Sequence, residues 1–524
     1  MNSYLERISA TARKAAQSKD WARVSACAKE ILKQRKNSAE GYFLLGIAEK
    51  AMNRPREAVA KLSKSIKLDD KRYDAAIELA SQYLLSNQYA EAVMLLQRYE
   101  AHLSNSPRYL DMAGTIYTHV GLPDRGWPLY QKANELQPGV DALQANLAAC
   151  SVFVGKTDDA KRIYRRLLKK FPNHQRNHYE LSRLERATDS IHVEQMKEVL
   201  RSTNLSPDKK IFIYYAIGKE LEDLEQWDEA FHYFNLAGDA VAAVAKYDVA
   251  TDLQLIDKII DVCTPDWLDT GKKETPRDVA EKTPIFIVGL PRTGTTLTER
   301  IVSCHSLVES IGETFFMQVV LKRESGIDST ENMNPAIIEA VAKKDIRHIA
   351  AAYLEAVRFK FGDSPMFIEK LPENVLYLGL IAKAYSHARI IHLNRHPMDA
   401  CFAMYKQSFF RFAYTLDDLG RYYVAYNRLL NHWRETLEDR LIEVEYESLV
   451  ADQEGQTRIL LEELGLDFEE ACLNFDQNIT ASNTASTVQV REKIHTRSVD
   501  RWKHFAKHLQ PLRHHLENAG IVVA

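Results

Sequence analysis

The sequence predicts a chain of two parts: an all-helical solenoid of repeats, followed by an α/β domain with a parallel sheet and a phosphate-binding loop. The first part is predicted by small residues that recur every 34 residues in helix-forming sequence. The second is predicted by short β-branched runs that alternate with helical stretches, and by one glycine-rich loop after the first run. We therefore expect repeats over residues 1–263, a linker over 264–283 and the α/β domain over 284–524.

The repeats are identified by two series of small residues that share one period. The series are Gly46, Ala80, Gly114 and Ala148, and Ala58, Ala92, Gly126 and Ala160. A further copy is centred on Gly218 and Ala230, and Pro138 and Pro172 stand where repeats end. The pattern resembles the tetratricopeptide repeat, whose two helices pack closely at the small positions. The resemblance implies a right-handed superhelix that presents a concave face to a protein or peptide.

The composition argues against several classes of protein. A net charge of -3 over 524 residues gives no general attraction for nucleic acid, so we expect no nucleic-acid partner. The six cysteines have no C-x-x-C spacing, which favours free thiols in a reducing compartment. No run of about 18 apolar residues occurs, and we expect a cytoplasmic protein without membrane contact. The sequence leaves the oligomeric state open.

The glycine-rich loop lacks the lysine that nucleoside-triphosphate hydrolases carry at this point. In FIVGLPRTGTTLTERIV, residues 286–302, Gly289 and Gly294 have the spacing G-x-x-x-x-G, but Thr295 follows where lysine is expected. Backbone N–H groups of such a loop, with the N-terminus of the next helix, favour an anion. Arg292 supplies a cation inside the loop, which indicates a donor with a single 5′-phosphate rather than a metal-bound triphosphate. We therefore expect no metal ion.

Three more polar clusters follow predicted strands, and the carboxyl ends of parallel strands share one edge of a sheet. Lys370 ends the strand in FIEKLPENVLYL, and Arg395 follows the strand in ARIIHLNRHPMDACFAMY. Taken alone, Arg395 could instead pair with Asp399, four residues on. The third cluster is a basic loop, TASTVQVREKIHTRSVDRW, with Ser486, Gln489, Arg491, Arg497 and Arg501.

Together these motifs resemble the sulfotransferases that use 3′-phosphoadenosine 5′-phosphosulfate (PAPS). The motifs are GLPRTGTT, CHSLVESIGET, EKLPEN and R-x-P-x-D, in this order. With the repeats, the chain looks most like bacterial proteins that join tetratricopeptide repeats to a domain related to tyrosylprotein sulfotransferases. The resemblance covers residues 284–508. It implies transfer of a sulfuryl group from PAPS to an acceptor hydroxyl, with protein tyrosine as one acceptor and the repeats as its docking surface.

The resemblance also implies roles for single residues. Glu313, in SIGET, matches the general base that accepts the acceptor's proton, with His305 and His495 as the next candidates. Lys370 and Ser486 match groups that, with Arg292, stabilise the bridging and transferring oxygens. Ala403 stands where the family has a serine ligand of the 3′-phosphate. The donor-binding positions are matched by Arg292, Thr293, Gly294, Thr295, Thr296, Arg395, Tyr446, Ser486, Gln489, Arg491 and Arg501.

Two other functions fit the same sequence. One is a non-catalytic repeat scaffold whose sulfotransferase-like domain has decayed to a nucleotide-binding or structural module. Ala403 favours this reading, whereas the joint presence of Arg292, Glu313, Lys370 and Arg395 favours catalysis. The other is a sulfotransferase that acts on a carbohydrate or a small phenol, because acceptor choice depends on pocket shape, which a sequence does not show.

Overall fold

The structure, a computed structural model, describes residues 3–103, 105–270, 282–478, 480–481, 484, 487 and 489–523. By its internal contacts the chain divides into two compact units, Met1–Val154 and Gly155–Ala524. None of the helices in the described ranges is both long enough and apolar enough to cross a membrane.

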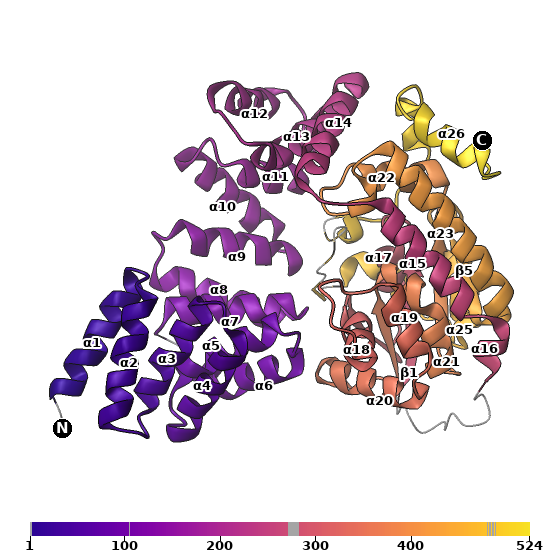
Figure 1. Ribbon diagram of the computed structural model, residues 1–524. Coiled ribbons are helices and arrows are strands. Elements are labelled where there is room, and N and C mark those ends of the chain that lie inside the picture. Colours follow the sequence, from indigo (N-terminus) through magenta and orange to yellow (C-terminus); the bar gives the residue numbers. More distant parts are fainter. Residues whose placement is uncertain are drawn as a thin grey trace. The chain divides into compact units, whose positions relative to one another are not determined.

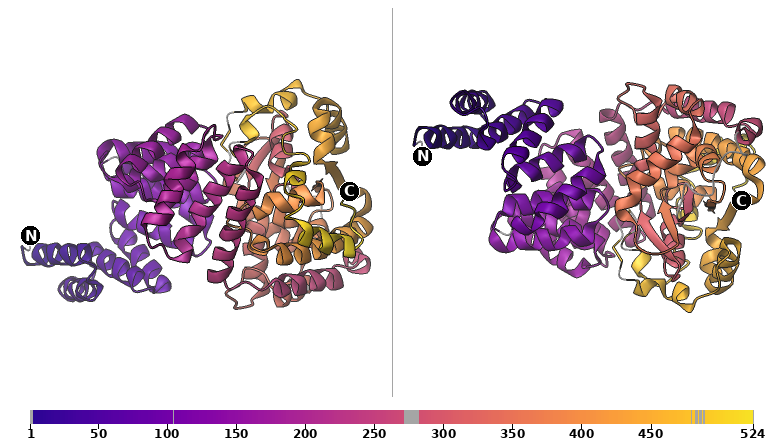
Figure 2. Two further views of the ribbon diagram at one scale, coloured as in Figure 1. Left: turned by 90° about the horizontal axis from the view of Figure 1, so that it is seen from above. Right: turned by 90° about the horizontal axis from the view of Figure 1, so that it is seen from below.

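The first unit is entirely helical over its described residues, and its helices run back and forth in chain order (Figure 1 and Figure 2). A Cβ atom on Gly46 of α3 would lie 2.8 Å from the Leu62 side chain of α4, so these helices approach as closely as glycine allows. Ala80 and Ala148 are likewise fully buried. The predicted helical solenoid is confirmed. Its helices are α1 (Ser3–Gln17), α2 (Trp21–Gln34), α3 (Ala39–Ala51), α4 (Pro55–Leu68), α5 (Tyr73–Leu85), α6 (Tyr89–Tyr99), α7 (Pro107–His119), α8 (Pro123–Leu136) and α9 (Asp141–Phe153).

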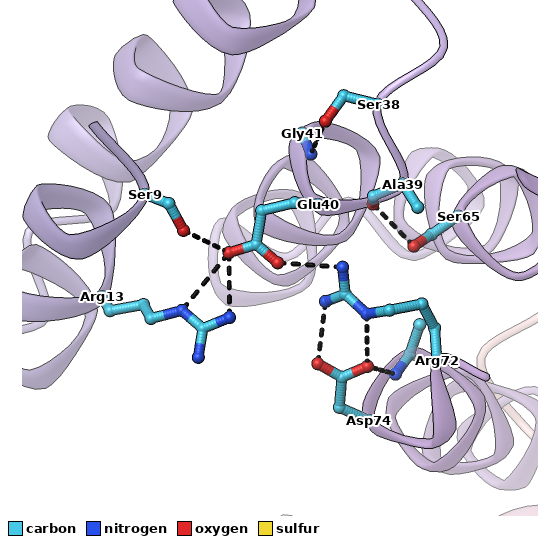
Figure 3. A network of polar contacts seen from close by, with 10 residues as sticks. Ser9, Arg13, Ser38, Ala39, Glu40, Gly41, Ser65, Arg72 and Asp74 are labelled. Carbon is cyan, nitrogen blue, oxygen red and sulfur yellow. Dashed lines mark hydrogen bonds and ion pairs between the residues drawn. The ribbon is translucent and has the colours of Figure 1, made fainter. Parts of the chain in front are cut away.

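A polar network joins three of these helices (Figure 3). Glu40, in the first turn of α3, accepts hydrogen bonds from Ser9 and Arg13 of α1, with the Arg13 Nη2 at 3.0 Å. Its other oxygen lies 2.9 Å from the guanidinium of Arg72, which also donates two bonds of 2.8 Å to Asp74. Because its main charges have partners within the unit, we interpret the network as structural.

The second unit begins with further helices of the same kind. They are α10 (Thr157–Lys170), α11 (Gln175–Leu184), α12 (Ile191–Ser202), α13 (Pro207–Asp223), α14 (Trp227–Val244) and α15 (Val249–Val262). The repeat predicted around Gly218 and Ala230 is the pair α13–α14. A Cβ atom on Gly218 would lie 2.7 Å from the ring of Phe234, which is the close approach that the repeat pattern predicts.

A five-stranded parallel sheet follows, in the order β2-β3-β1-β4-β5. The central strand β1 is buried almost throughout, as its unbroken apolar sequence predicts. In register, Ile287 lies beside Lys370 of β3, and Gly289 lies beside Leu393 of β4. The strands are β1 (Thr283–Gly289), β2 (Val308–Gly312), β3 (Met366–Lys370), β4 (Arg389–Asn394) and β5 (Leu441–Glu445).

Helices cover both faces of the sheet, and successive residues of β1 point to opposite sides. Ile287 packs in a core with Ile301 and Leu461, from helices on one face. Phe286 contacts the rings of Tyr353 and Tyr385 on the other. The predicted α/β domain with a parallel sheet is confirmed. Its helices are α17 (Thr295–Val302), α18 (Phe316–Ser325), α19 (Pro335–Ala342), α20 (Ile346–Val357), α21 (Leu378–Ala384), α22 (Pro397–Tyr405), α23 (Leu416–Leu437), α24 (Tyr446–Ala451), α25 (Gln453–Leu464) and α26 (Gln510–Asn518).

The predicted domain boundaries at residues 263 and 284 stay a prediction, since the division by contacts falls after Val154. Within the predicted linker, Pro265–Asp269 form the short helix α16. Its Trp267 donates a hydrogen bond of 3.1 Å to the carbonyl of Ala342, and the ammonium of Lys383 lies 3.9 Å from the centre of its ring. This part of the linker therefore packs on the α/β domain. Residues 271–281 lie outside the described residues.

Candidate active site

The parallel sheet brings the sequence-predicted clusters to one edge. The phosphate-binding loop leaves β1 at Gly289, Lys370 ends β3, and Arg395 follows the last residue of β4. Glu313 follows β2, whose last residue, Gly312, lies beside β3 near its end. Four segments far apart in the sequence thus end together, as expected for the carboxyl edge of a parallel sheet.

The phosphate-binding loop adopts a backbone that few side chains tolerate. Gly289, Arg292 and Gly294 have φ angles of 148°, 68° and 102°. A Cβ atom on Gly294 would lie 2.6 Å from the ring of Tyr446, so a larger residue would displace that ring. Successive N–H groups in such a turn, together with the start of α17, form a concave site for an anion.

The three threonines of the loop are buried in this turn. They are Thr293, Thr295 and Thr296. The hydroxyl of Thr293 donates to the Leu290 carbonyl at 2.7 Å, which closes the loop on itself. Thr295 is the first residue of α17, so its backbone N–H belongs to the helix N-terminus that faces the loop.

Lys370 lies between two carboxylates at the end of β3. Its side chain has no exposed surface, and its ammonium forms an ion pair with Glu313. The same nitrogen lies 3.6 Å from Oε2 of Glu299 on α17, and Glu299 in turn accepts a 2.6 Å hydrogen bond from Ser310. The structure therefore brings together the two residues predicted as general base and oxygen-stabilising cation. The sequence analysis missed Glu299, which sits three residues past Thr296 without a distinguishing pattern.

A second buried acid, Glu369, adjoins this pair and was also missed. It is fully buried and accepts hydrogen bonds from the hydroxyls of Thr314 and Tyr353. Burial raises the pKa of Glu369 to about 7, although these hydrogen bonds favour its ionised form. Thr314 directly follows Glu313, and Glu369 directly precedes Lys370. The hydrogen bond between Thr314 and Glu369 thus joins the residue after Glu313 to the residue before Lys370.

Two arginines meet at the loop. Arg395 donates a 2.7 Å hydrogen bond from Nη1 to the carbonyl of Arg292, and its guanidinium lies 4.7 Å from the centre of the Tyr446 ring. Arg292 donates a 2.7 Å bond to the amide oxygen of Gln489. Burial, with the charges of Arg395 and Arg183, lowers the pKa of Arg292 to about 10. A cation whose pKa is depressed by burial and by a second cation favours an anionic ligand.

The alternative partner of Arg395, Asp399, is engaged elsewhere. Its two oxygens accept the backbone N–H groups of Asp500 and Trp502, at 2.7 and 2.9 Å. Arg395 instead donates from Nη2 to the carbonyl of Ser498 at 2.6 Å, while its Nε is buried without a hydrogen-bond partner in the described part of the chain. A buried N–H of this kind fits an anion beside the loop.

Two predicted donor ligands of the basic loop lie against the repeat part of the second unit, one at the turn before α10 and one at α13. Arg491 approaches the backbone of Gly155, where a Cβ atom would come within 2.5 Å of its Nη1. Arg501 donates to Glu222 of α13 at 3.0 Å. Neither contact has a signal in the local sequence.

Two more of the predicted positions are Ser486 and Ala403. Ser486 lies outside the described residues, so its role stays a prediction. Ala403 is a partly buried residue of α22, where it offers no hydroxyl to a ligand. The predicted ligand Tyr446 contacts Arg395, and the predicted ligand Gln489 contacts Arg292.

His305, a second candidate for the base, is bound to backbone groups on both sides of its ring. It is buried, its Nε2 lies 3.0 Å from the carbonyl of Asp467, and its Nδ1 accepts the N–H of Leu307 at 3.1 Å. Both ring nitrogens of His305 are therefore engaged by backbone groups.

Fold and site together define the class of protein: a parallel α/β domain whose phosphate-binding loop carries an arginine in place of the usual lysine, beside a lysine–glutamate pair. Comparison with known families agrees with this class. Residues 284–470 match the model of the sulfotransferase family, and residues 130–174 match that of the tetratricopeptide repeat. The chain carries a sulfotransferase domain together with tetratricopeptide repeats.

Three relatives illustrate the range of the similarity. A protein of Aquifex aeolicus is 27% identical over 73% of this chain and 51% of its own length. Protein-tyrosine sulfotransferase 1 of Danio rerio is 24% identical over 42% of this chain and 65% of its own. The protein-tyrosine sulfotransferase of Drosophila melanogaster is 23% identical over 42% of this chain and 46% of its own. The chain thus spans about half to two thirds of the length of these relatives.

Proposed function

We propose that the C-terminal domain transfers a sulfuryl group from PAPS to an acceptor hydroxyl. The observation that carries this proposal is the contact between Glu313 and the buried ammonium of Lys370, at the sheet edge that also holds the phosphate-binding loop. A proton acceptor and a cation side by side at an anion site suit a transfer in which a hydroxyl loses its proton while an oxygen of the donor gains charge.

The donor site is formed by the loop and the two arginines. The loop from Arg292 to Thr296 would hold the 5′-phosphosulfate. Arg395, whose buried Nε lacks a hydrogen-bond partner among the described residues, would hold the 3′-phosphate. Tyr446, packed between Gly294 and Arg395, keeps the two halves of the site in place.

PAPS supplies the sulfuryl group, which carries less charge than a terminal phosphoryl group. The charge that develops on the donor oxygens can therefore be stabilised without a metal-bound triphosphate site. We assign this stabilisation to Arg292 of the loop and to Lys370 at the end of β3. Arg292 lies in the loop that leaves β1, and Lys370 ends β3, the strand next to β1.

Glu313 is assigned as the general base. Its carboxylate is held by the Lys370 ammonium and supplies an oxygen that can accept the acceptor's proton. Once Glu313 has taken this proton, the Lys370 ammonium keeps Glu299 as a second counter-charge at 3.6 Å and can donate to the bridging oxygen of the donor. In this assignment Glu313 acts on the acceptor hydroxyl and Lys370 acts on the bridging oxygen of the donor.

For the acceptor we propose protein tyrosine, with the repeats as docking surface. The names of the Danio and Drosophila relatives support the tyrosine, and the repeats support a protein or peptide partner. All six cysteines are free thiols, which supports a reducing compartment and hence our placement of the protein in the cytoplasm.

The test is incubation of the purified chain with ³⁵S-labelled PAPS and a lysate of its own cells, with Arg292→Ala as the matched control. We expect label on tyrosine of a protein, and none with the variant. Label on a glycan or a small phenol would keep the transferase and change the acceptor. Binding of the donor without transfer to any fraction would favour the non-catalytic scaffold.

A further inference from the structure

Glu222, near the end of α13, is a buried carboxylate that joins two cations of the sulfotransferase domain. Only 7% of the residue is exposed. Its two oxygens lie 2.7 and 2.8 Å from the ammonium of Lys406, which follows α22. Arg501 donates to the same carboxylate from Nε at 3.0 Å and to the Glu222 carbonyl from Nη2 at 3.3 Å. One residue of a repeat helix thus binds one of the predicted donor ligands by side chain and backbone.

The charges of this cluster depend on one another. Burial alone would raise the pKa of Glu222, but Lys406 and Arg501 outweigh it and hold that pKa below its ordinary value. Burial lowers the pKa of Lys406, and the charges of Arg501 and Arg292 lower it further, against the effect of Glu222. Removal of Glu222 would therefore leave two partly buried cations without this counter-charge, which disfavours the present arrangement.

The segment 498–502 connects this cluster to the phosphate-binding loop. On its other side, the carbonyl of Ser498 accepts a hydrogen bond from Arg395 at 2.6 Å, and Arg395 donates to the carbonyl of Arg292 at 2.7 Å. Asp399 accepts the N–H groups of two residues of the segment, at 2.7 and 2.9 Å, and so fixes the turn in between. Contacts therefore run without a gap from Glu222 through this segment to the arginine of the loop.

We propose that Glu222 is a positioning residue of the donor site: its carboxylate fixes Arg501, and with it the segment 498–502, against the phosphate-binding loop. The last repeat pair, α13–α14, is then a structural part of the donor site as well as the end of the repeat array. The inference rests on the proposed function, because it takes Arg501 as a ligand of the donor.

The test measures binding of adenosine 3′,5′-bisphosphate to the full chain by calorimetry, with the melting temperature recorded for each variant. We expect Glu222→Gln to weaken binding about tenfold, the effect of losing one charge-assisted hydrogen bond. Glu222→Asp keeps the charge but shortens the side chain, so it should weaken binding as well, and it keeps the test decisive if Glu222→Gln does not fold. Arg501→Met should weaken binding when it is introduced alone. Combined with Glu222→Gln, it should weaken binding little further.

The matched control is Asp228→Asn. Asp228 lies in the first turn of α14 and contacts Lys507 at 2.7 Å and His508 at 2.8 Å. Asp228→Asn and Glu222→Gln each replace a carboxylate of the pair α13–α14 that contacts residues 501–508. Only Glu222, however, binds Arg501. We expect Asp228→Asn to bind the nucleotide within twofold of the unmodified chain.

The outcomes separate the inference from the proposed function. If the unmodified chain does not bind the nucleotide, the proposed function fails, and the inference fails with it. If it binds, and Glu222→Gln binds as well as Asp228→Asn or more tightly, the inference alone is overturned. Normal binding by Glu222→Asp would also overturn it, since charge rather than position would then account for the effect.

Discussion

Replacement of the buried acid Glu369 by glutamine should change how the stability of the protein depends on pH. The pKa of Glu369 is about 7, against an ordinary value of 4.5, because the side chain is buried. At about 1.36 kcal/mol per pKa unit, this difference corresponds to about 3 kcal/mol. The folded state binds the proton more tightly than the unfolded state, so this contribution to stability is complete below pH 4.5 and is lost as the pH rises through 7.

Glutamine does not titrate, and Glu369→Gln should therefore gain stability relative to the unmodified chain as the pH rises. Urea unfolding at pH 4.5 and pH 8 measures the free energy of unfolding of both proteins. The difference between these free energies should shift by about 3 kcal/mol in favour of the variant between the two pH values. Glu339→Gln is the control, because Lys343 holds the pKa of this exposed residue below its ordinary value, so its contribution to stability is lost as the pH falls and not as the pH rises through 7. If the difference in unfolding free energy between Glu369→Gln and the unmodified chain is the same at both pH values, the reasoning is refuted.

Two further predictions concern the donor site and its supports. Arg292→Ala should abolish turnover and weaken calorimetric binding of adenosine 3′,5′-bisphosphate by about 1.5 to 3 kcal/mol, the value of a charge-assisted hydrogen bond; unchanged turnover would remove Arg292 from the site. A chain of residues 155–524 should bind the nucleotide as the full chain does. Residues 282–524 should bind poorly and aggregate in size-exclusion chromatography, because Trp227 and Phe231 no longer cover the buried ring of Phe505. Equal binding by both fragments would show that α13–α14 is dispensable.

Much of the fold could be predicted because it depends on local patterns. Small residues such as Gly46 recur at the helix crossings, and the β-branched run that contains Ile287 forms the central strand. The loop glycines, Lys370 and Arg395 follow predicted strands, so topology alone brings them to one edge.

The contacts that complete the site could not be predicted in this way. Glu222 lies 184 residues from Lys406 and 279 residues from Arg501, and no local pattern marks an acid whose partners are so distant. Glu369 stands beside the predicted Lys370, yet its alternating position on β3 turns it toward other, buried hydroxyl partners. The sequence shows which residues are present, whereas pairing across such distances follows from the packed structure.

The most direct test of the central claim is single-turnover transfer from PAPS by Glu313→Gln, with donor affinity measured in parallel. Glutamine keeps the shape of Glu313 and removes its basicity, so we predict that turnover falls by roughly 10² to 10⁴ while donor affinity stays within about threefold. Near-normal turnover would contradict the assignment of Glu313 as the base, and a large loss of donor binding would make its role structural.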